Sequence, residues 1–412
     1  MLKNIDKKVE KLLCDAERDC REIFEKLDDL SKNRTDDIMD AFAEFRVSES
    51  DFISSSGYGY GDVGRDKLDK IWARVFGTEA ALVRPHIVNG THALTIGLFA
   101  LLRPNDVLLS VTGKPYDTLD CAIGITNKDG RGSLYDFGVK YREVSLLADT
   151  KIDFDGIEKN LTDDVKVVYL QRSRGYAQRR ALTVSQIDEV YSFVKARSNA
   201  FVAVDNCYGE FTEKKEPNAD LLIGSLIKNP GGGFAECGGY LAGDEKAVDL
   251  CAARLTSPGI GAECGASLSQ NKNMYRGLFY APHTVSQAQK TAILAAYILE
   301  KLGYDVSPKY NEYRSDIIEA VNFNSADKLC AFCRGIQSAS PIDSFVVPEP
   351  WDMPGYADKV IMAAGAFVQG SSIELSCDGP LKPPYTAFFQ GGLTYESGRI
   401  AIAVAASKLI SE

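Results

Sequence analysis

The spacing of hydrophobic residues divides the chain into three stretches. Residues 2–47 carry apolar side chains at helical intervals among many charges and contain no glycine, which predicts amphipathic helices. From about residue 80, short apolar runs alternate with helical patterns such as 92–102 and 185–197. A long helical pattern then covers 284–302 and is followed by mixed segments, with no internal repeat.

The short apolar runs are typical of strands that are buried on both faces of a sheet. The predicted strands are Ala80–Arg84, Val107–Val111, Val165–Leu170, Phe201–Val204, Leu221–Ile223 and Gly239–Ala242. Such strands separated by helices indicate an α/β fold with a mostly parallel sheet. We expect three parts: a helical arm and loop over 1–60, a large α/β domain over 61–285, and a smaller C-terminal α+β domain over 286–412.

The net negative charge of the chain limits the kinds of partner that it is expected to bind. Lys and Arg number 47 against 57 Asp and Glu, which gives a net charge of −10. An acidic chain without a basic stripe is a poor candidate for binding nucleic acid. The longest apolar runs, such as 93–102, are too short to span a bilayer, and the first residues lack the apolar core of a secretory signal. We therefore expect a cytoplasmic protein that binds neither nucleic acid nor membrane.

The ten cysteines include one Cys-x-x-Cys pair, Cys330 and Cys333. A zinc site needs a second pair or nearby histidines, and the only histidines are His86, His92 and His283. We expect reduced thiols on one helical turn and no metal.

A literal dinucleotide-binding motif, Gly-x-Gly-x-x-Gly, covers residues 59–64. The motif requires a buried strand before it and a helix after it. A helical pattern follows over 65–76, but the preceding residues 51–56 do not form a strand pattern. The sequence therefore favours a glycine-rich loop over an NAD site.

Two polar groups follow predicted strands directly. Asp205 ends the run Phe201–Val204, and ligands of open α/β sheets bind beyond the carboxyl ends of strands. Lys228 lies between apolar residues and three glycines, an unusual place for a solvated cation. An amine whose pKa is lowered by desolvation or by a neighbouring cation is nucleophilic and suits Schiff-base chemistry. The alternatives are a helix-capping role for Asp205 and a surface turn for Lys228.

An anion site is predicted before the helical pattern 92–102. Gly90 and Thr91 present backbone N–H groups at the positive end of the helix dipole, although Thr91 could equally be only an N-cap. Ser225 adds a hydroxyl, and Tyr116, after a predicted strand, adds a ring that can stack on a flat cofactor. Anion cradle, aromatic ring, carboxylate and lysine together meet the needs of pyridoxal 5′-phosphate (PLP).

The segment Val204-Asp205-Asn206, followed by Ser225-x-x-Lys228, resembles the Cys/Met-metabolism family of fold-type I PLP enzymes, which includes cystathionine lyases and methionine γ-lyase. The run Asn89–Ala93 is similar to that family's phosphate loop. The resemblance is greatest to a bacterial branch described as aluminium-resistance or methionine-γ-lyase-like carbon–sulfur lyases. It rests on the runs GYGYGDVGRD, ALVRPHIVNGTHAL, GSLIKNPGGG, PGIGAECG and QGGLTYE, and it covers nearly the whole chain.

The resemblance implies a PLP-dependent transferase-like fold of type I with a sheet of seven strands. It also implies a homotetramer, or at least a dimer with shared active sites. The loop 57–65 lies where the family sends a tyrosine and an arginine into the neighbouring subunit's phosphate site. Tyr58 or Tyr60, together with Arg65, match these residues, and Ser173 matches a further contact to the cofactor ring.

The chain departs from the family in two places. The family's lyases have Ser or Thr after the Asp-Asn pair, where this chain has Cys207, which we interpret as a buried small thiol. They also hold the substrate carboxylate with an arginine at the start of a late strand. Arg399, before the apolar run 400–404, is the nearest match, and Lys382 and Arg174 are further candidates.

The resemblance implies a carbon–sulfur lyase that eliminates a thiol from a sulfur-containing amino acid, of the cystathionine β-lyase or methionine γ-lyase type. Lys228 would remove the α-proton, Asp205 would keep the pyridine nitrogen protonated, and Tyr116 would protonate the leaving thiolate. The alternatives are an aminotransferase or aldolase-type PLP enzyme on the same scaffold, or a PLP-binding protein without catalysis.

Overall fold

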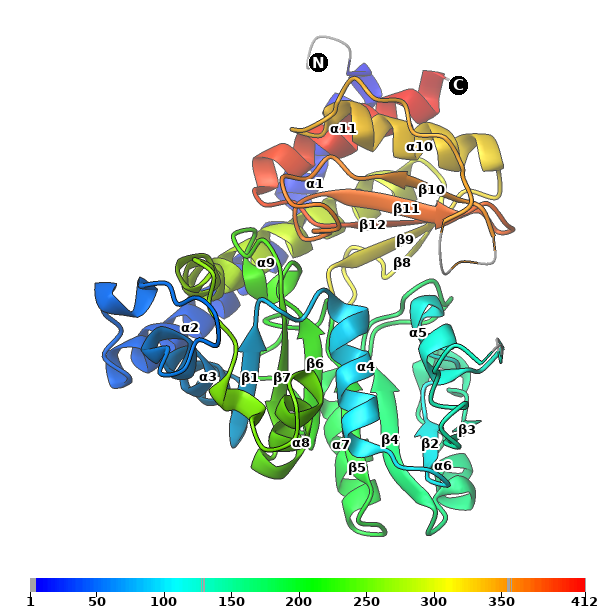
Figure 1. Cartoon of the computed structure of the whole chain (residues 1–412). Coiled ribbons are helices and arrows are strands. Elements are labelled where there is room, and N and C mark those ends of the chain that lie inside the picture. Colours follow the sequence, from blue (N-terminus) through cyan, green and yellow to red (C-terminus); the bar gives the residue numbers. More distant parts are fainter. Residues whose placement is uncertain (1–4, 127, 129, 354–355, 357, 412) are drawn as a thin grey trace.

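The alternating strands and helices of the first two thirds of the chain form one large sheet (Figure 1). The computed structural model describes residues 5–126, 128, 130–353, 356 and 358–411. The seven strands lie in the order β1-β7-β6-β5-β4-β2-β3, and only β7 runs antiparallel to its neighbours. They are β1 (Ala80–Arg84), β2 (Val107–Ser110), β3 (Lys140–Glu143), β4 (Val165–Gln171), β5 (Phe201–Asp205), β6 (Leu221–Ser225) and β7 (Gly239–Gly243).

Six of these strands confirm the predicted ones, and β3 was not predicted. Its residues, Lys-Tyr-Arg-Glu, are exposed or half-buried because β3 pairs with β2 alone at the edge of the sheet. Without a continuous apolar run, it carries no signal of a buried strand.

Helices cover both faces of the large sheet (Figure 1). They are α3 (Val63–Phe76), α4 (Gly90–Leu101), α5 (Asp117–Ile123), α6 (Phe154–Asn160), α7 (Val184–Lys195) and α8 (Glu245–Leu255). Alternate residues of one strand point to opposite faces, so Val202 and Val204 join the cluster with α3, α6 and α7. Ala203, between them, joins the cluster with α4, α5 and α8. Burial on both faces explains why these strands are apolar throughout.

The C-terminal third forms a second, antiparallel sheet in the order β10-β11-β12-β9-β8. Its strands are β8 (Asp305–Ser307), β9 (Ile318–Asn322), β10 (Val360–Ala363), β11 (Ser376–Pro380) and β12 (Thr386–Gln390). The helices α10 (Ala326–Ala339) and α11 (Tyr395–Ser411) pack on this sheet and on each other (Figure 1). Cys330 and Cys333 are buried on α10, and the described residues contain no group of three His, Cys, Asp or Glu side chains placed to hold a metal.

One long helix, α9 (Asn271–Lys301), belongs to both domains. Met274, Leu278 and Val285 pack in the core of the large domain, whereas Leu294 and Ile298 pack in the core of the small one. The expected boundary after residue 285 therefore falls inside a continuous helix. Throughout the described part of the chain, every helix is too short or too polar to cross a bilayer.

The N-terminal arm consists of α1 (Lys7–Asp19) and α2 (Arg21–Glu44), followed by the short 3-10 helix η2 (Glu49–Phe52). Val9 and Leu13 of α1 pack in the small-domain core, and Ile38 of α2 packs in the large-domain core. The arm thus joins the two domains of its own chain. Further 3-10 turns are η3 (Ala148–Thr150), η4 (Asn229–Gly231) and η5 (Gly261–Glu263).

The run that begins at Arg399 is helical, which corrects the prediction of a late strand there. It lies within α11, where Ala401, Ile402 and Ala403 are all buried. A helix buried on most of its surface produces the same continuous apolar run as a buried strand, so periodicity alone does not separate the two.

Candidate active site

A cavity of about 540 Å³ lies between the two domains, at the carboxyl ends of β4, β5 and β6. The small domain contributes residues of β9, β11 and β12 to its wall. The cavity is lined by seven of the predicted residues, Gly90, Thr91, Tyr116, Ser173, Asp205, Ser225 and Lys228. Residues from five separate segments thus converge where ligands of open α/β sheets bind.

Lys228 is half-buried and lies three residues beyond the end of β6. Its Nζ donates to the Tyr208 hydroxyl over 2.7 Å and lies 4.0 Å from the centroid of that ring. Burial lowers the pKa of Lys228, but Tyr208, Cys207 and Asp205 outweigh it and raise the pKa above its ordinary value. This corrects the expectation of a lowered pKa, because anionic and polar neighbours, rather than a cation, surround the amine.

Tyr208 belongs to the site although the sequence analysis did not select it. Its hydroxyl accepts from Lys228 and from the Ser372 hydroxyl, the latter over 3.1 Å. Its backbone has a φ of 69°, a left-handed conformation that is uncommon for a residue with a side chain. Its position shortly after the Asp205-Asn206 pair, at the end of β5, was the available signal.

Asp205 is the last residue of β5, and its carboxylate is buried. The backbone N–H of Cys207 donates to Oδ1 over 3.1 Å, and the Tyr169 hydroxyl donates to Oδ2 over 3.5 Å. Burial raises the pKa of Asp205, while the Cys207 N–H and the Lys228 charge act in the opposite direction. A protonated ring nitrogen held against this carboxylate would offset its desolvation.

The predicted anion cradle lies at the first turn of α4. Asn89 is the N-cap, since its side chain accepts from the His92 N–H over 2.8 Å, so Thr91 is not the cap. The N–H groups of Gly90 and Thr91 lie in the first turn, where a helix has no acceptors for them. Nearby, the Ser225 Oγ is buried and has no hydrogen-bond partner among the described residues. These donors fit a phosphate.

Tyr116 lies at the start of α5, and its ring lines the cavity. Its hydroxyl is hydrogen-bonded to the Tyr356 hydroxyl, and its ring meets the Tyr176 ring edge-on at 5.9 Å. Burial, followed by the nearby Tyr356 and Asp378, raises the pKa of Tyr116 well above its ordinary value. The phenol therefore stays protonated at neutral pH and is a weaker acid than an exposed tyrosine.

Ser173 follows the end of β4 and is buried in the cavity wall. Its hydroxyl donates to Asp316 Oδ2 over 3.2 Å, and this bond fixes its orientation in the free protein.

The glycine-rich loop lies outside this cavity. Tyr58 and Tyr60 are 68% and 61% exposed, and their rings stack at 5.5 Å. Arg65 is buried instead, because its guanidinium donates to the carbonyls of Gly59 and Gly265 over 2.8 and 2.7 Å. The structure thus corrects the expectation that Arg65 reaches outward with the tyrosines. In the described chain before the loop there are helices, η2 and turns but no strand, so the strand that a dinucleotide-binding motif requires is missing.

The three candidates for a carboxylate anchor all lie outside the cavity. Arg399 pairs with Glu17 of α1, and Lys382 is exposed and pairs with Asp358 over 2.7 Å. Arg174 is buried, and its guanidinium donates to the Ser307 carbonyl. Among the described residues, no arginine lines the cavity. Each candidate is held by partners of its own, so none is free to meet a substrate there.

Sequence relatives cover almost the whole chain. The family model described as methionine gamma-lyase matches residues 9–410. The chain belongs to the methionine gamma-lyase family. This confirms the resemblance that the motifs around Asp205 and Lys228 carry, and the family's description supports an enzyme of the lyase class.

Several individual relatives of this family member are known. A carbon–sulfur lyase involved in aluminium resistance from Clostridium novyi NT is 52% identical, with a TM-score of 0.95 over 98% of this chain and 96% of that one. The uncharacterized protein YnbB of Bacillus subtilis is 49% identical over 408 residues, which cover 98% of this chain and 97% of that protein. The PLP-dependent protein YhfS of Escherichia coli, at 15% identity and a TM-score of 0.59, covers 91% of this chain and 96% of that one, and it shares the fold.

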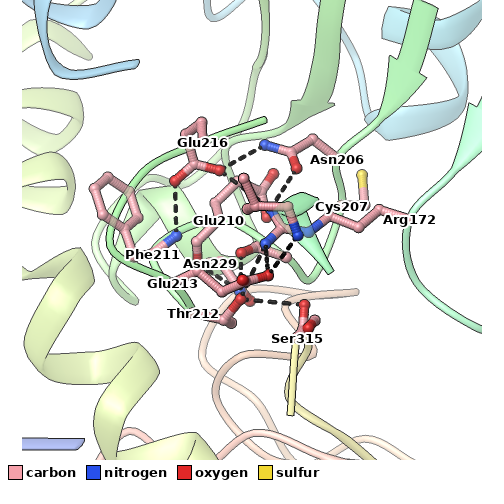
Figure 2. A network of polar contacts seen from close by, with 12 residues as sticks. Arg172, Asn206, Cys207, Glu210, Phe211, Thr212, Glu213, Glu216, Asn229 and Ser315 are labelled. Carbon is pink, nitrogen blue, oxygen red and sulfur yellow. Dashed lines mark hydrogen bonds and ion pairs between the residues drawn. The ribbon is translucent and has the colours of Figure 1, made fainter. Parts of the chain in front are cut away.

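Behind the cavity of this lyase-family protein lies a buried polar network (Figure 2). Arg172 donates to Asn206 over 2.8 Å and forms ion pairs with Glu213 and Glu216 at 3.0 and 3.2 Å. Arg34 of the N-terminal arm pairs with the other oxygen of Glu216 at 3.2 Å. The network holds Asn206, the neighbour of Asp205, and so it fixes the end of β5 from behind.

A second branch of the network holds the segment that follows Lys228 (Figure 2). The Asn229 side chain donates to the Glu210 carbonyl over 3.0 Å, and the Tyr240 hydroxyl donates to the Glu210 carboxylate over 2.7 Å. Asp205 and Lys228 are therefore both positioned by neighbouring residues that do not line the cavity.

Proposed function

We propose that this protein is a PLP-dependent carbon–sulfur lyase that eliminates a thiol from a sulfur-containing amino acid. The single observation that carries the proposal is the convergence of Lys228, Asp205 and the α4 cradle on one cavity. Family membership and the 52% identical carbon–sulfur lyase support the reaction type.

The lining residues fit PLP group by group. The Lys228 amine would join the aldehyde, Asp205 would bind the ring nitrogen, and Tyr116 would lie against the ring. The N–H groups of Gly90 and Thr91, together with the unpartnered Ser225 hydroxyl, would hold the phosphate. When bound, PLP supplies an electron sink that stabilises negative charge at the α-carbon of an amino acid.

The side chains of this chain then move the protons. The Lys228 amine takes the α-proton, and the Tyr208 hydroxyl, 2.7 Å away, orients that amine. Tyr116, whose ring lines the cavity, donates to the sulfur as the carbon–sulfur bond breaks. The products are a thiol and, after addition of water, ammonia and a 2-oxo acid.

The exposed loop tyrosines belong to the same proposal. Tyr58 and Tyr60 form a stacked aromatic pair on the surface, away from the cavity of their own chain. In a homodimer or homotetramer with shared active sites, they would complete the phosphate site of the neighbouring subunit. The placement of such an assembly in the cytoplasm is part of the proposal as well.

One observation favours a second candidate, a PLP-binding protein without turnover or a PLP enzyme of another reaction type. The described cavity lining contains no arginine to hold a substrate carboxylate. Such a protein would bind PLP and would release no thiol.

The test is incubation of the PLP-loaded protein with L-cystathionine, L-methionine and S-alkyl-L-cysteines, with thiol, ammonia and 2-oxo acid measured together. The proposal expects all three products in equal amounts from at least one substrate, with Lys228→Ala inactive and Lys382→Ala active. A 2-oxo acid without thiol would indicate transamination, and an unresponsive PLP spectrum would indicate a protein without catalysis.

A further inference from the structure

Three charged side chains are present in the described lining of the cavity: Lys228, Asp205 and Asp378. Lys228 and Asp205 face the aldehyde and the ring nitrogen in the proposed function. Asp378, in the middle of β11 in the small domain, has no part in holding the cofactor. A charged group in a substrate cavity needs a reason, because burying a carboxylate without a cation is costly.

The carboxylate of Asp378 has one oxygen occupied and one free. The residue is 6% exposed, and its Oδ2 accepts from the Tyr176 hydroxyl over 2.8 Å. Its Oδ1 is buried and has no hydrogen-bond partner within the described part of the chain. Burial raises the pKa of Asp378 to about 6, with Tyr176 and Lys228 acting in the opposite direction, so it is mainly ionised at neutral pH.

Aromatic rings surround this carboxylate. Phe388, its register partner on β12, lies 4.9 Å from the Tyr176 ring, and Tyr176 also contacts Tyr116 and Tyr356 at 5.9 and 5.6 Å. Aromatic faces combined with a carboxylate attract an ammonium or guanidinium group, through the ring quadrupole and a charge-assisted hydrogen bond. The same charge repels an anionic side chain.

We propose that Asp378 is a specificity-determining residue that binds a cationic group at the far end of the substrate's thioether side chain. The inference rests on the proposed lyase function. Asp378 selects aminoalkyl thioethers of cysteine or homocysteine over neutral alkyl thioethers. It also selects neutral thioethers over those with an anionic side chain. The free Oδ1 accepts from the substrate ammonium, and Tyr176 keeps the carboxylate oriented.

The test compares S-(2-aminoethyl) and S-propyl derivatives, which have similar shapes but differ by one charge. Each S-substituent is tested on both L-cysteine and L-homocysteine, so that elimination at the β-carbon or the γ-carbon is detected by its 2-oxo acid product. For the wild type, we expect kcat/KM to favour the aminoethyl substrate by about 10- to 100-fold, the range of a hydrogen bond between charged groups. Asp378→Asn should reduce this ratio to about 1.

Asp358→Asn is the matched control, because Asp358 is also a small-domain carboxylate but pairs with Lys382 outside the cavity. It should keep the wild-type ratio. Should Asp378→Asn fail to fold, the order of the wild-type kcat/KM values decides. S-carboxymethyl-L-cysteine is then expected to be the poorest substrate of the cysteine series.

The outcomes separate the inference from the function on which it rests. Elimination of both substrates with a wild-type ratio near 1 overturns the inference and leaves the lyase function intact. A ratio that survives in Asp378→Asn, with both rates lowered equally, shows a structural role and also overturns it. If none of these thioethers is cleaved, and neither L-cystathionine nor L-methionine is cleaved either, the lyase function itself is refuted.

Discussion

Two neighbouring polar regions of this protein differ in how their groups are paired. In the network behind the site, both oxygens of Glu216 and both terminal nitrogens of Arg172 are bonded within the chain (Figure 2). Among the described residues of this network, four buried atoms remain without a partner: Arg34 Nε, Arg172 Nε, Glu210 Oε2 and Asn229 Oδ1. In the cavity wall, the described residues leave Ser225 Oγ, Gln171 Oε1, Asp378 Oδ1 and Gln390 Oε1 all buried and unpartnered.

Both regions thus keep four buried atoms without partners, and they differ in position and charge: the network's charged groups are ion-paired outside the cavity, whereas the unpaired atoms of the wall line it. Buried polar atoms without partners cost free energy, and a ligand in the cavity can complete the bonds of the wall atoms but cannot reach those of the network. Loss of a network residue should therefore affect folding, whereas loss of a cavity residue should affect binding and turnover.

Lys228→Ala should have the largest effect and should act on chemistry. Removal of the group that takes the α-proton lowers kcat/KM by about 10³-fold or more. The measurement is thiol release by the PLP-loaded variant, compared with Lys382→Ala, whose side chain is exposed outside the cavity. Comparable losses in both variants would remove Lys228 from the centre of the site.

Arg172→Met tests the polar network behind the cavity and should lower the free energy of unfolding. It leaves the largely buried Glu213 without its cation and leaves Glu216 with Arg34 alone, which costs about 3–5 kcal/mol. Denaturant unfolding of the PLP-free protein measures this loss. Arg180→Met is the control, since its ion pair with Glu312 is largely exposed and is worth about 1 kcal/mol or less. Equal losses would erase the distinction between the two regions.

Ser225→Ala should weaken PLP binding without weakening the fold. A hydrogen bond to a charged phosphate is worth about 1.5–3 kcal/mol, so the PLP dissociation constant should rise by about 10- to 100-fold. Equilibrium titration with PLP measures the shift, with Ser185→Ala on the exposed face of α7 as control. Unchanged PLP affinity combined with lower stability would assign Ser225 to the structural group.

Glu210 sharpens the comparison, because it lies in the network yet keeps one oxygen unpartnered. Burial raises the pKa of Glu210 to about 8, although the Tyr240 hydroxyl bonds to it. The folded state therefore binds a proton more tightly than the unfolded state, and stability falls as pH rises from the unfolded pKa toward 8.

Glu210→Gln should remove this dependence, which amounts to about 1 kcal/mol per pH unit between pH 6 and 7.5. Unfolding free energies of both proteins at several pH values measure the difference in slope, whatever constant offset the amide introduces. Parallel curves would show that Glu210 is ionised throughout that range.

Much of this architecture could be predicted because burial leaves a direct trace in the sequence. The apolar strand ending in Asp205 and the lysine before three glycines are local patterns, and both led to the cavity. The glycine-rich loop was also interpreted correctly, since the missing strand before it is a local feature.

The remaining features depend on contacts between distant segments. Arg65 turns inward because it meets the Gly265 carbonyl, 200 residues away, and Tyr208 joins the site through its bond to Lys228. Asp378 stands in the run Ser376–Pro380, whose Asp, Gly and Pro are poor strand formers, and pairing with β10 and β12 brings it to the cavity. The fully apolar run after Arg399 indicated a strand because α11 is buried on most sides.

The most direct test of the central claim is to reduce the PLP-loaded wild-type protein with borohydride, digest it and locate the pyridoxyl group by mass spectrometry. The account predicts one modified peptide, with the label on Lys228 and a loss of visible absorbance that matches the amount of label. A label on another lysine, or a protein that takes up no label after incubation with excess PLP, would contradict it.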